Sequence, residues 1–177
     1  AAIKGFSQLC NNRFFLIDKN KKIKISFLEK YIKKNPNKKS IIFGFTSNVW
    51  EKLIMQLKIK KINLEKNNSI LIHGGGWKKM RNLNISNLSF KSEAIKTIGC
   101  SDVINYYGMI EQTGSVFLEC KEGYFHCSIF SDILIRDVGL KLSKIGDVGL
   151  IQTMSLLPLS YPGHNLLTED MGVIRGI

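Results

Sequence analysis

The chain has 177 residues, 44% of them apolar and 23% charged, and its formal net charge at pH 7 is +12. The apolar and charged fractions are ordinary for a soluble globular protein, and the length allows one sizeable core or two small subdomains that share one. No apolar run approaches the roughly 18 residues that a membrane-spanning helix needs, so the sequence predicts no membrane span.

Nothing in the sequence indicates secretion. The opening stretch A-A-I-K-G-F is not a signal peptide, and it lacks an initiator Met, which indicates that the natural chain begins earlier. The four cysteines show no C-x-x-C pair and no spacing typical of a secreted disulfide framework. We therefore expect a cytoplasmic protein.

The positive charge is concentrated in the first half of the chain. Residues 1–96 hold 21 Lys and Arg against 5 Asp and Glu, whereas residues 97–177 hold 5 against 9. Such asymmetry can mark a nucleic-acid-binding half, and a basic nucleic-acid-binding module is therefore one interpretation. However, 22 of the 26 cations are scattered Lys, and only four are Arg, the residue best suited to bidentate phosphate contacts. A solvated lysine-rich surface is the preferred interpretation.

Helices and strands alternate through the first hundred residues. Three apolar runs predict short strands and lie at 40–45, 69–73 and 102–107. Apolar residues at helical spacing predict three helices, around 26–35, 50–57 and 90–98. Ser26 and Glu29 match a capping box at the first helix, and Gly99 is expected to close the third. This alternation predicts an α/β fold with a mostly parallel sheet flanked by helices.

After residue 114 the pattern changes to short strands joined by turns. The segments 115–120 and 124–130 flank Lys-Glu-Gly and predict a β-hairpin. Further strands are predicted in the segments 132–137, 147–154 and 166–174. We predict an α/β subdomain over residues 1–114, followed by an antiparallel β-rich subdomain over residues 115–177.

Three predicted strands end in residues that suit a bound ligand. These stretches are His73-Gly74-Gly75-Gly76, Tyr107-Gly108-Met109-Ile110-Glu111 and Thr168-Glu169-Asp170. In open α/β sheets, ligands bind beyond the carboxyl ends of the strands. Each stretch alone is more often an ordinary turn or packing segment. Their combination, in this order, predicts a nucleotide site.

The residue types match the parts of a nucleotide. A glycine run lets a planar ligand or a phosphate approach the backbone, and a Tyr beside a Gly offers a stacking surface. A carboxylate a few residues later can hold Mg²⁺ against phosphate oxygens. A late Asp can accept hydrogen bonds from the ribose hydroxyls.

The stretch Y-G-M-I-E-Q, with H-G-G-G-W-K-K before it and S-Y-P-G-H-N-L-L-T-E-D-M-G after it, resembles the adenylate-forming ligases. Within them the chain is most similar to the LuxE-type acyl-protein synthetases, relatives of the phenylacetate–CoA ligases. The resemblance runs from about Ile41 to Gly172 and includes I-I-F-G-F-T-S-N-V-W. It implies that the first subdomain carries the adenine and acyl side of the site, and that the second ends at the ribose-binding motif.

The resemblance also implies the parts of an adenine pocket. Tyr107 would stack on the adenine ring, and Asn105 and Gly108 would line the same pocket. The floor between the adenine and the acyl group would come from three glycines, Gly74, Gly75 and Gly76.

Two acidic residues take the remaining roles that the resemblance implies. Glu111 would be the catalytic carboxylate that holds the Mg²⁺ of ATP, and Asp170 would bind the ribose hydroxyls. Ile110 stands where most of the superfamily has a phosphate-contacting Thr, so that hydroxyl is absent here. Glu169 replaces the usual Gly of T-G-D, which puts the geometry of the ribose contact in doubt.

Some parts of the family's pattern are missing. The chain has no Ser/Thr/Gly-rich phosphate loop of the S-G-T-T-G kind. The family's lid, with its catalytic Lys, should follow Asp170, as should any acyl-accepting Cys beyond the lid. We therefore interpret the chain as an internal fragment of a longer enzyme and expect it to be inactive in adenylation by itself.

A structural zinc site is an alternative use of three residues near the predicted hairpin. Cys120, His126 and Cys127 flank its turn, and soft ligands on facing strands can hold zinc. A tetrahedral site needs a fourth ligand, which Cys100 could supply only through the fold. Packing of free cysteines is the preferred interpretation.

The function implied is ATP-dependent activation of a fatty acid as an acyl-adenylate, followed by transfer of the acyl group to a protein thiol. The cofactors would be ATP and Mg²⁺, and the partner would be an acyl-accepting protein or a fatty-acid reductase. An acyl- or aryl-CoA ligase of the phenylacetate–CoA ligase type is the alternative within enzymes. Clustered Arg beside exposed aromatic residues would favour nucleic acid instead, and the chain shows scattered Lys.

Overall fold

The computed structural model describes residues 2–20, 22–77 and 82–176. Lys78 and Lys79, which end the H-G-G-G-W-K-K stretch, lie outside the described residues. The chain divides into two compact units, Ala2–Tyr106 and Tyr107–Ile177. The sequence predicted a boundary slightly further along the chain, after residue 114.

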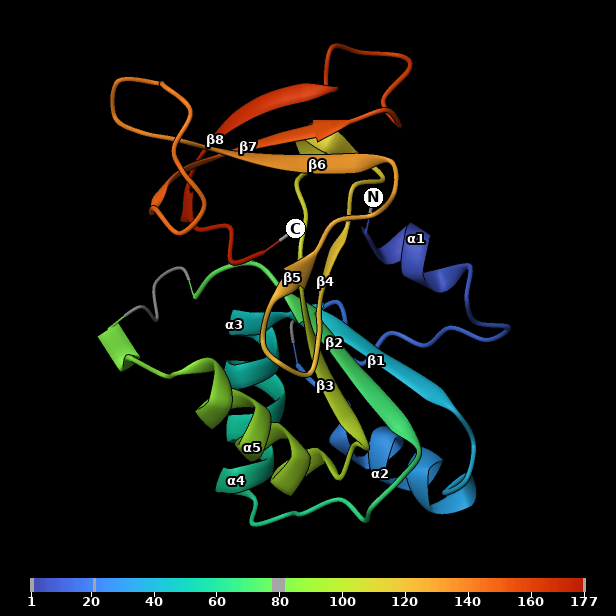
Figure 1. Cartoon of the computed structure of the whole chain (residues 1–177). Helices are drawn as coiled ribbons and strands as arrows, with labels where there is room; N and C mark the ends of the chain where they lie inside the picture. Colours follow the sequence, from blue (N-terminus) through green and yellow to red (C-terminus); the bar gives the residue numbers. More distant parts are fainter. Residues whose placement is uncertain (1, 21, 78–81, 177) are drawn as a thin grey trace. The chain divides into compact units, whose positions relative to one another are not determined.

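The first unit is built on three parallel strands (Figure 1). They are β1 (Ser40–Phe45), β2 (Ser69–Gly74) and β3 (Asp102–Tyr107). β2 pairs with β1 on one side and with β3 on the other, so that Leu71 lies opposite both Ile42 and Val103. All three strands fall where the sequence predicted them, and the α/β class is confirmed.

Two helices of the first unit precede β1, and the others occupy the connections between the strands, as the alternating pattern predicted. They are α1 (Ala2–Ser7), α2 (Ile25–Lys34), α3 (Thr46–Asn48), the π-helix η1 (Val49–Ile54), α4 (Met55–Ile59) and α5 (Asn87–Ile98). No helix in the described ranges is long and apolar enough to cross a membrane.

One apolar core holds the first unit together. Buried side chains from helices α2, η1, α4 and α5 pack with strands β2 and β3 in a single cluster that includes Leu28, Leu53, Leu57, Leu71, Phe90, Ala94, Ile98 and Val103. α2 and α5 contribute core residues three or four positions apart, because these positions share one face of a helix. The burial of this apolar surface is the main force that fixes the helices on the sheet.

The ends of two helices test the predicted caps. α5 ends at Gly99, whose φ of 71° is left-handed, so the predicted closing residue is confirmed. The predicted capping box at Ser26 is wrong, because α2 begins at Ile25 and is preceded by Lys24, which makes no side-chain cap. The reason is tertiary packing: Ile25 is 4% exposed and belongs to the core, so the helix starts before Ser26.

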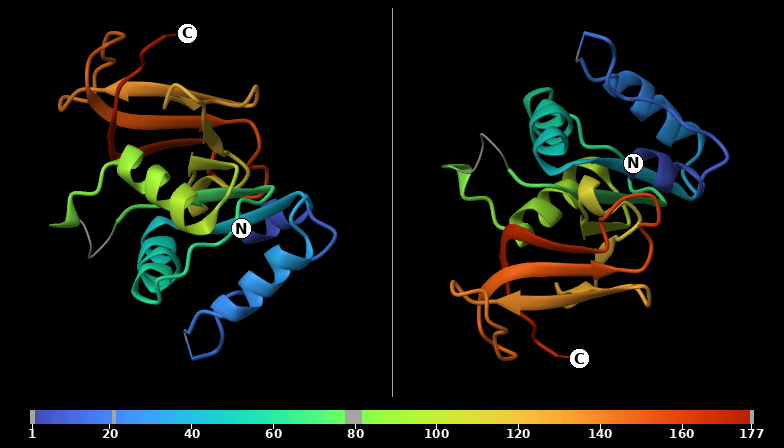
Figure 2. Two further views of the ribbon diagram at one scale, coloured as in Figure 1. Left: turned by 90° about the horizontal axis from the view of Figure 1, so that it is seen from below. Right: turned by 90° about the horizontal axis from the view of Figure 1, so that it is seen from above.

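The second unit is antiparallel, as predicted. A short hairpin joins β4 (Phe117–Glu119) to β5 (Phe125–His126). Three longer strands follow and form a sheet in the order β6-β7-β8, namely β6 (Ser131–Arg136), β7 (Gly149–Ser155) and β8 (Asn165–Gly172). Figure 2 shows these three strands side by side from two further directions.

Leu57 provides a test of the core. It is fully buried on α4, whereas Ile59 on the same helix is 67% exposed. Leu57→Ala should lower the free energy of unfolding by about 2–5 kcal/mol, because it removes buried apolar atoms and leaves a cavity. Ile59→Ala, the matched control, should change it by less than about 0.5 kcal/mol. Urea denaturation followed by circular dichroism measures both, and equal effects would contradict the core described here.

Candidate functional site

Tyr107 and Asp170 lie in direct contact within the second unit. The Tyr107 hydroxyl donates a hydrogen bond of 2.8 Å to Asp170 Oδ2. The Tyr107 ring packs against Phe117 and Phe125, with ring centroids 6.0 and 6.4 Å away. Burial and the hydrogen bond to Asp170 raise the pKa of Tyr107 to about 12. The hydroxyl therefore remains a donor at neutral pH.

A β-bulge in β8 sets the position of Asp170. The pairing with β7 shifts between Leu150 and Gln152, so that the three residues 168–170 lie opposite Ile151 alone. The Thr168 hydroxyl closes the bulge, because it donates to the Ile151 carbonyl at 2.9 Å and accepts the Asp170 N–H at 3.2 Å. Bulges of this kind re-aim a side chain, and here the Thr of T-x-D fixes the backbone of the Asp.

The two departures from the family's motifs are accommodated without backbone strain. Glu169 lies within β8 and is not among the residues of positive φ, so the backbone there does not require Gly. Ile110 is 82% exposed at the start of the short 3-10 helix η3 (Ile110–Gln112).

The turn that carries Glu111 is fastened by the residue next to it. Gln112 is only 1% exposed, and its Nε2 donates to the carbonyl oxygens of Thr153 at 3.3 Å and Gly163 at 3.0 Å. One residue further, the Thr113 N–H donates to the Tyr161 hydroxyl at 2.8 Å. The turn is thus held on β7 and on the segment that leads into β8.

The Glu111 side chain suits a magnesium ion that also binds phosphate. Glu111 is exposed, and among the described residues of its own unit no hydrogen bond or ion pair engages its carboxylate. Mg²⁺ in nucleotide sites commonly takes one or two carboxylates, with phosphate oxygens and water as its other ligands. A single exposed carboxylate therefore fits this ion.

The glycine run lies in the first unit, at the end of β2. A Cβ at Gly74 would clash with the Tyr106 ring, and Gly75 has a φ of 76°. Tyr106 is 6% exposed and packs against Phe43, so it is a core residue, as the alternation along β3 predicted. Gly76 is exposed, and a Cβ there would meet nothing within 4 Å. Gly108 follows β3 and is exposed in the second unit.

A cavity of about 200 Å³ opens beside the glycine run. Its lining residues are Thr46, His73, Gly75, Trp77, Asn87, Phe90 and Asn105. Thr46 Oγ1 lies 2.9 Å from His73 Nδ1 and donates to the Gly74 carbonyl at 3.2 Å. The His73 ring packs on Phe90 with centroids 4.3 Å apart. Two predicted site residues, Gly75 and Asn105, therefore share one cavity that combines amide, imidazole and aromatic groups.

The residues considered for zinc do not form a metal site. Backbone hydrogen bonding at Tyr124 and the His126 side chain lower the pKa of the Cys120 thiol, whereas burial raises the pKa of Cys127. In the part of the chain that the structure describes, no three His, Cys, Asp or Glu residues come together as metal ligands. Cys120, His126 and Cys127 therefore do not gather around one ion.

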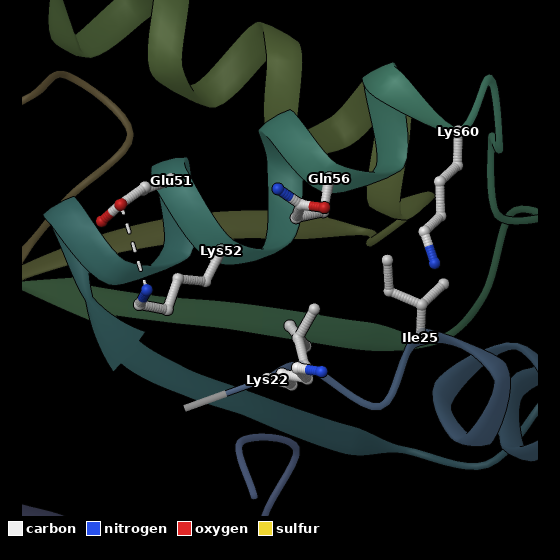
Figure 3. Close-up of a pocket in the computed structure, with 7 residues that line it drawn as sticks. Lys22, Ile25, Glu51, Lys52, Gln56 and Lys60 are labelled. Carbon is white, nitrogen blue, oxygen red and sulfur yellow. Dashed lines mark ion pairs between the residues drawn. The ribbon is translucent and has the colours of Figure 1, made fainter. Parts of the chain in front are cut away.

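A larger hollow of about 380 Å³ lies elsewhere on the first unit (Figure 3). Its lining residues are Lys22, Ile23, Ile25, Glu51, Lys52, Gln56 and Lys60. Lys52 and Glu51 form an ion pair of 3.9 Å. The lining contains lysines but neither an Arg nor an aromatic ring, so it lacks the stacking surface that single-stranded nucleic acids use. This hollow does not favour the nucleic-acid interpretation.

The fold is that of the adenylate-forming ligases. The anthranilate CoA ligase AuaEII in complex with anthranoyl-AMP matches with a TM-score of 0.57 and 11% identity, over 83% of this chain and 29% of its own. A luciferase-like enzyme from the mealworm Zophobas morio matches at 0.53 and 14%, over 84% and 36%. ATP-bound MatB from Rhodopseudomonas palustris matches at 0.51 and 15%, over 76% and 28%. The chain spans about a third or less of the length of these enzymes.

The sequence itself settles the family. Residues 1–176 match the family model described as "Acyl-protein synthetase, LuxE". The chain belongs to the LuxE acyl-protein synthetase family. No curated protein matches the chain.

Several residues of the site escaped the sequence analysis. Gln112 and the Tyr161–Gly163 segment fasten the Glu111 turn, and Thr46 and His73 shape the cavity. Their sequence signal was weak, because each pair is brought together only by the fold. A polar Gln directly after the motif Glu, at a position that becomes buried, was the one hint available.

The Tyr107–Asp170 bond gives a prediction about stability and pH. Tyr107→Phe should lower the free energy of unfolding by about 1 kcal/mol, the usual net value of one hydrogen bond. Because the pKa of Tyr107 is about 12 in the folded chain and about 10 in an unfolded one, its contribution is complete below pH 10 and is lost between pH 10 and 12. Urea denaturation across this range measures both effects. Tyr124→Phe, at an exposed tyrosine, is the control; identical pH profiles for Tyr107→Phe and the unmodified chain would contradict the assignment.

Proposed function

We propose that this chain is part of an ATP-dependent ligase that activates a carboxylic acid as an acyl-adenylate. The observation that carries the proposal is the contact between Tyr107 and Asp170, with the exposed carboxylate of Glu111 four residues after the tyrosine. An aromatic ring, an acceptor for ribose hydroxyls and a carboxylate for a metal are the three groups that a bound ATP requires. Family membership supports the same conclusion.

Each residue of the second unit then has a defined task. The Tyr107 ring stacks on the adenine, and its hydroxyl holds one carboxylate oxygen of Asp170. The other oxygen of Asp170 is left for the ribose hydroxyls. The hydrogen bond therefore fixes the distance between the base and the ribose contacts before ATP arrives, which lowers the cost of ordering the site. Gly108 keeps the backbone after the tyrosine free of a side chain.

The first unit supplies the glycine run and the cavity next to it. In the proposed enzyme, Gly74, Gly75 and Gly76 form the floor between the adenine and the acyl group, and Asn105 lines the adenine pocket. The support is that Asn105 and Gly75 line one cavity with polar amides and aromatic rings. The need to avoid a clash at Gly74, and the positive φ at Gly75, explain why glycine occupies both positions.

The proposed chemistry has two steps. A carboxylate oxygen of the acid attacks the α-phosphorus of ATP, the bond to the β-phosphate breaks, and pyrophosphate leaves with the electron pair. A thiolate then attacks the acyl carbon, and AMP leaves. Glu111 would hold the Mg²⁺ that, when bound, neutralises the phosphate charge.

We propose a fatty acid as the acid and a protein thiol as the acceptor, in a complex with an acyl-accepting protein or a fatty-acid reductase. The family supports this choice, and an acyl- or aryl-CoA ligase is the alternative. The full-length enzyme should exchange pyrophosphate into ATP with fatty acids, and should do so more slowly with phenylacetate. It should release AMP with a protein thiol but not with CoA. The opposite acceptor preference would select the CoA ligase instead.

Two substitutions in the full-length enzyme separate binding from chemistry. Tyr107→Ala should weaken ATP binding by about 1–3 kcal/mol, the usual scale of base–aromatic stacking. Glu111→Gln should leave ATP affinity nearly unchanged and lower the rate of adenylation by at least about tenfold, because the metal loses a charged ligand. Calorimetry and acid-dependent pyrophosphate exchange measure the two effects. Unchanged affinity and turnover in both variants would overturn the proposed site.

A further inference from the structure

Gln112 is a deeply buried polar residue next to the proposed metal-binding carboxylate. It directly follows Glu111, and its side chain donates to two carbonyl oxygens, one on β7 (Thr153) and one just before β8 (Gly163). These acceptors lie 41 and 51 residues further along the chain. A single amide group therefore joins the Glu111 turn to two other segments of the same unit.

The backbones in this region approach each other closely. A Cβ placed on Gly163 would lie 2.5 Å from the Glu111 carbonyl oxygen, so any other residue there would push the turn away. The Tyr161 hydroxyl accepts the Thr113 N–H on the far side of Gln112. The segment 161–163 thus forms a seat for residues 111–113.

Packing alone does not explain why a glutamine occupies position 112, because its buried side chain leaves one oxygen without a hydrogen bond. Gln112 Oε1 and Thr153 Oγ1 are both buried, and within the described residues neither has a hydrogen-bond partner. A buried polar atom left in this way is destabilising, because it loses its hydrogen bonds to water and gains none in return. An apolar side chain of similar length, such as Met, would avoid the unpaired oxygen, but it could not hold the two carbonyls. The two donated bonds are what the amide contributes.

We propose that Gln112 is a positioning residue: with Tyr161 and Gly163 it docks the Glu111 turn on the β7–β8 sheet and so fixes the metal-binding carboxylate relative to Asp170. The seat leads directly into β8, the strand that carries Asp170 and that bonds Tyr107. The motif from Tyr107 to Thr113 is therefore held at both ends. Its first residue bonds β8, and its last residues bond the segment just before β8. The role of Glu111 in this inference rests on the proposed function, whereas the docking does not.

The first test measures docking alone. Hydrogen exchange of the backbone amides in residues 109–115 should become about tenfold faster in Gln112→Met, because two bonds that hold the turn are lost. Gln152→Met is the matched control: Gln152 lies beside Thr153 on β7 but bonds Arg136 and Asn165 instead. It should leave exchange at 109–115 unchanged. If Gln112→Met does not fold, Tyr161→Phe, which removes only the acceptor for Thr113, should accelerate exchange of the same segment.

The second test measures the consequence for the metal. In the full-length enzyme, Gln112→Met should raise the Mg²⁺ concentration needed for half-maximal adenylation several-fold, with little change in the KM for the acid. Unchanged exchange at 109–115 in both Gln112→Met and Tyr161→Phe would overturn the inference. Faster exchange at 109–115 in Gln112→Met, with an unchanged Mg²⁺ requirement, would overturn the claim that Gln112 positions Glu111 as a metal ligand. If Glu111→Gln also left that requirement unchanged, the proposed function of Glu111 would have failed instead.

Discussion

The hydrogen bond from the Tyr107 hydroxyl to Asp170 is the constraint on which the candidate site depends. It joins residues 63 positions apart, one at the end of a parallel strand and the other in a bulged antiparallel strand. The Tyr107 ring also packs against Phe117 and Phe125, and these contacts restrict the direction of its hydroxyl. The strands and turns between these residues bring the two side chains into contact.

A second attachment lies at the other end of the same motif. Gln112 reaches the carbonyls of Thr153 and Gly163, so the stretch from Tyr107 to Thr113 is anchored to the β7–β8 sheet twice. Short loops that carry function are usually held by a rigid scaffold in this way. The side chains of Ile110 and Glu111 are exposed, while Gln112, the residue that follows them, is buried and holds the loop.

Local sequence predicted the elements well where local forces decide them. The spacing of apolar residues and the residue types at turns predicted the three strands of the first unit, the glycine that ends α5 and the antiparallel pairing of the second unit. The capping box at Ser26 failed because the core requirement of Ile25 outweighed a capping preference of about 1 kcal/mol. The hairpin spacing had also allowed a zinc site, but among the described residues no three metal-ligating side chains come together.

The sequence by itself determined the class of fold and the family, because these depend on periodicity and on motifs along the chain. It also predicted which residues suit a nucleotide. It did not show that Tyr107 would bond Asp170, that Glu169 would sit in an unstrained strand, or that Gln112 would be buried. Only the tertiary structure decided these points. They depend on contacts between segments distant in sequence, whose pairing is set by the register of β7 and β8 and not by any local preference.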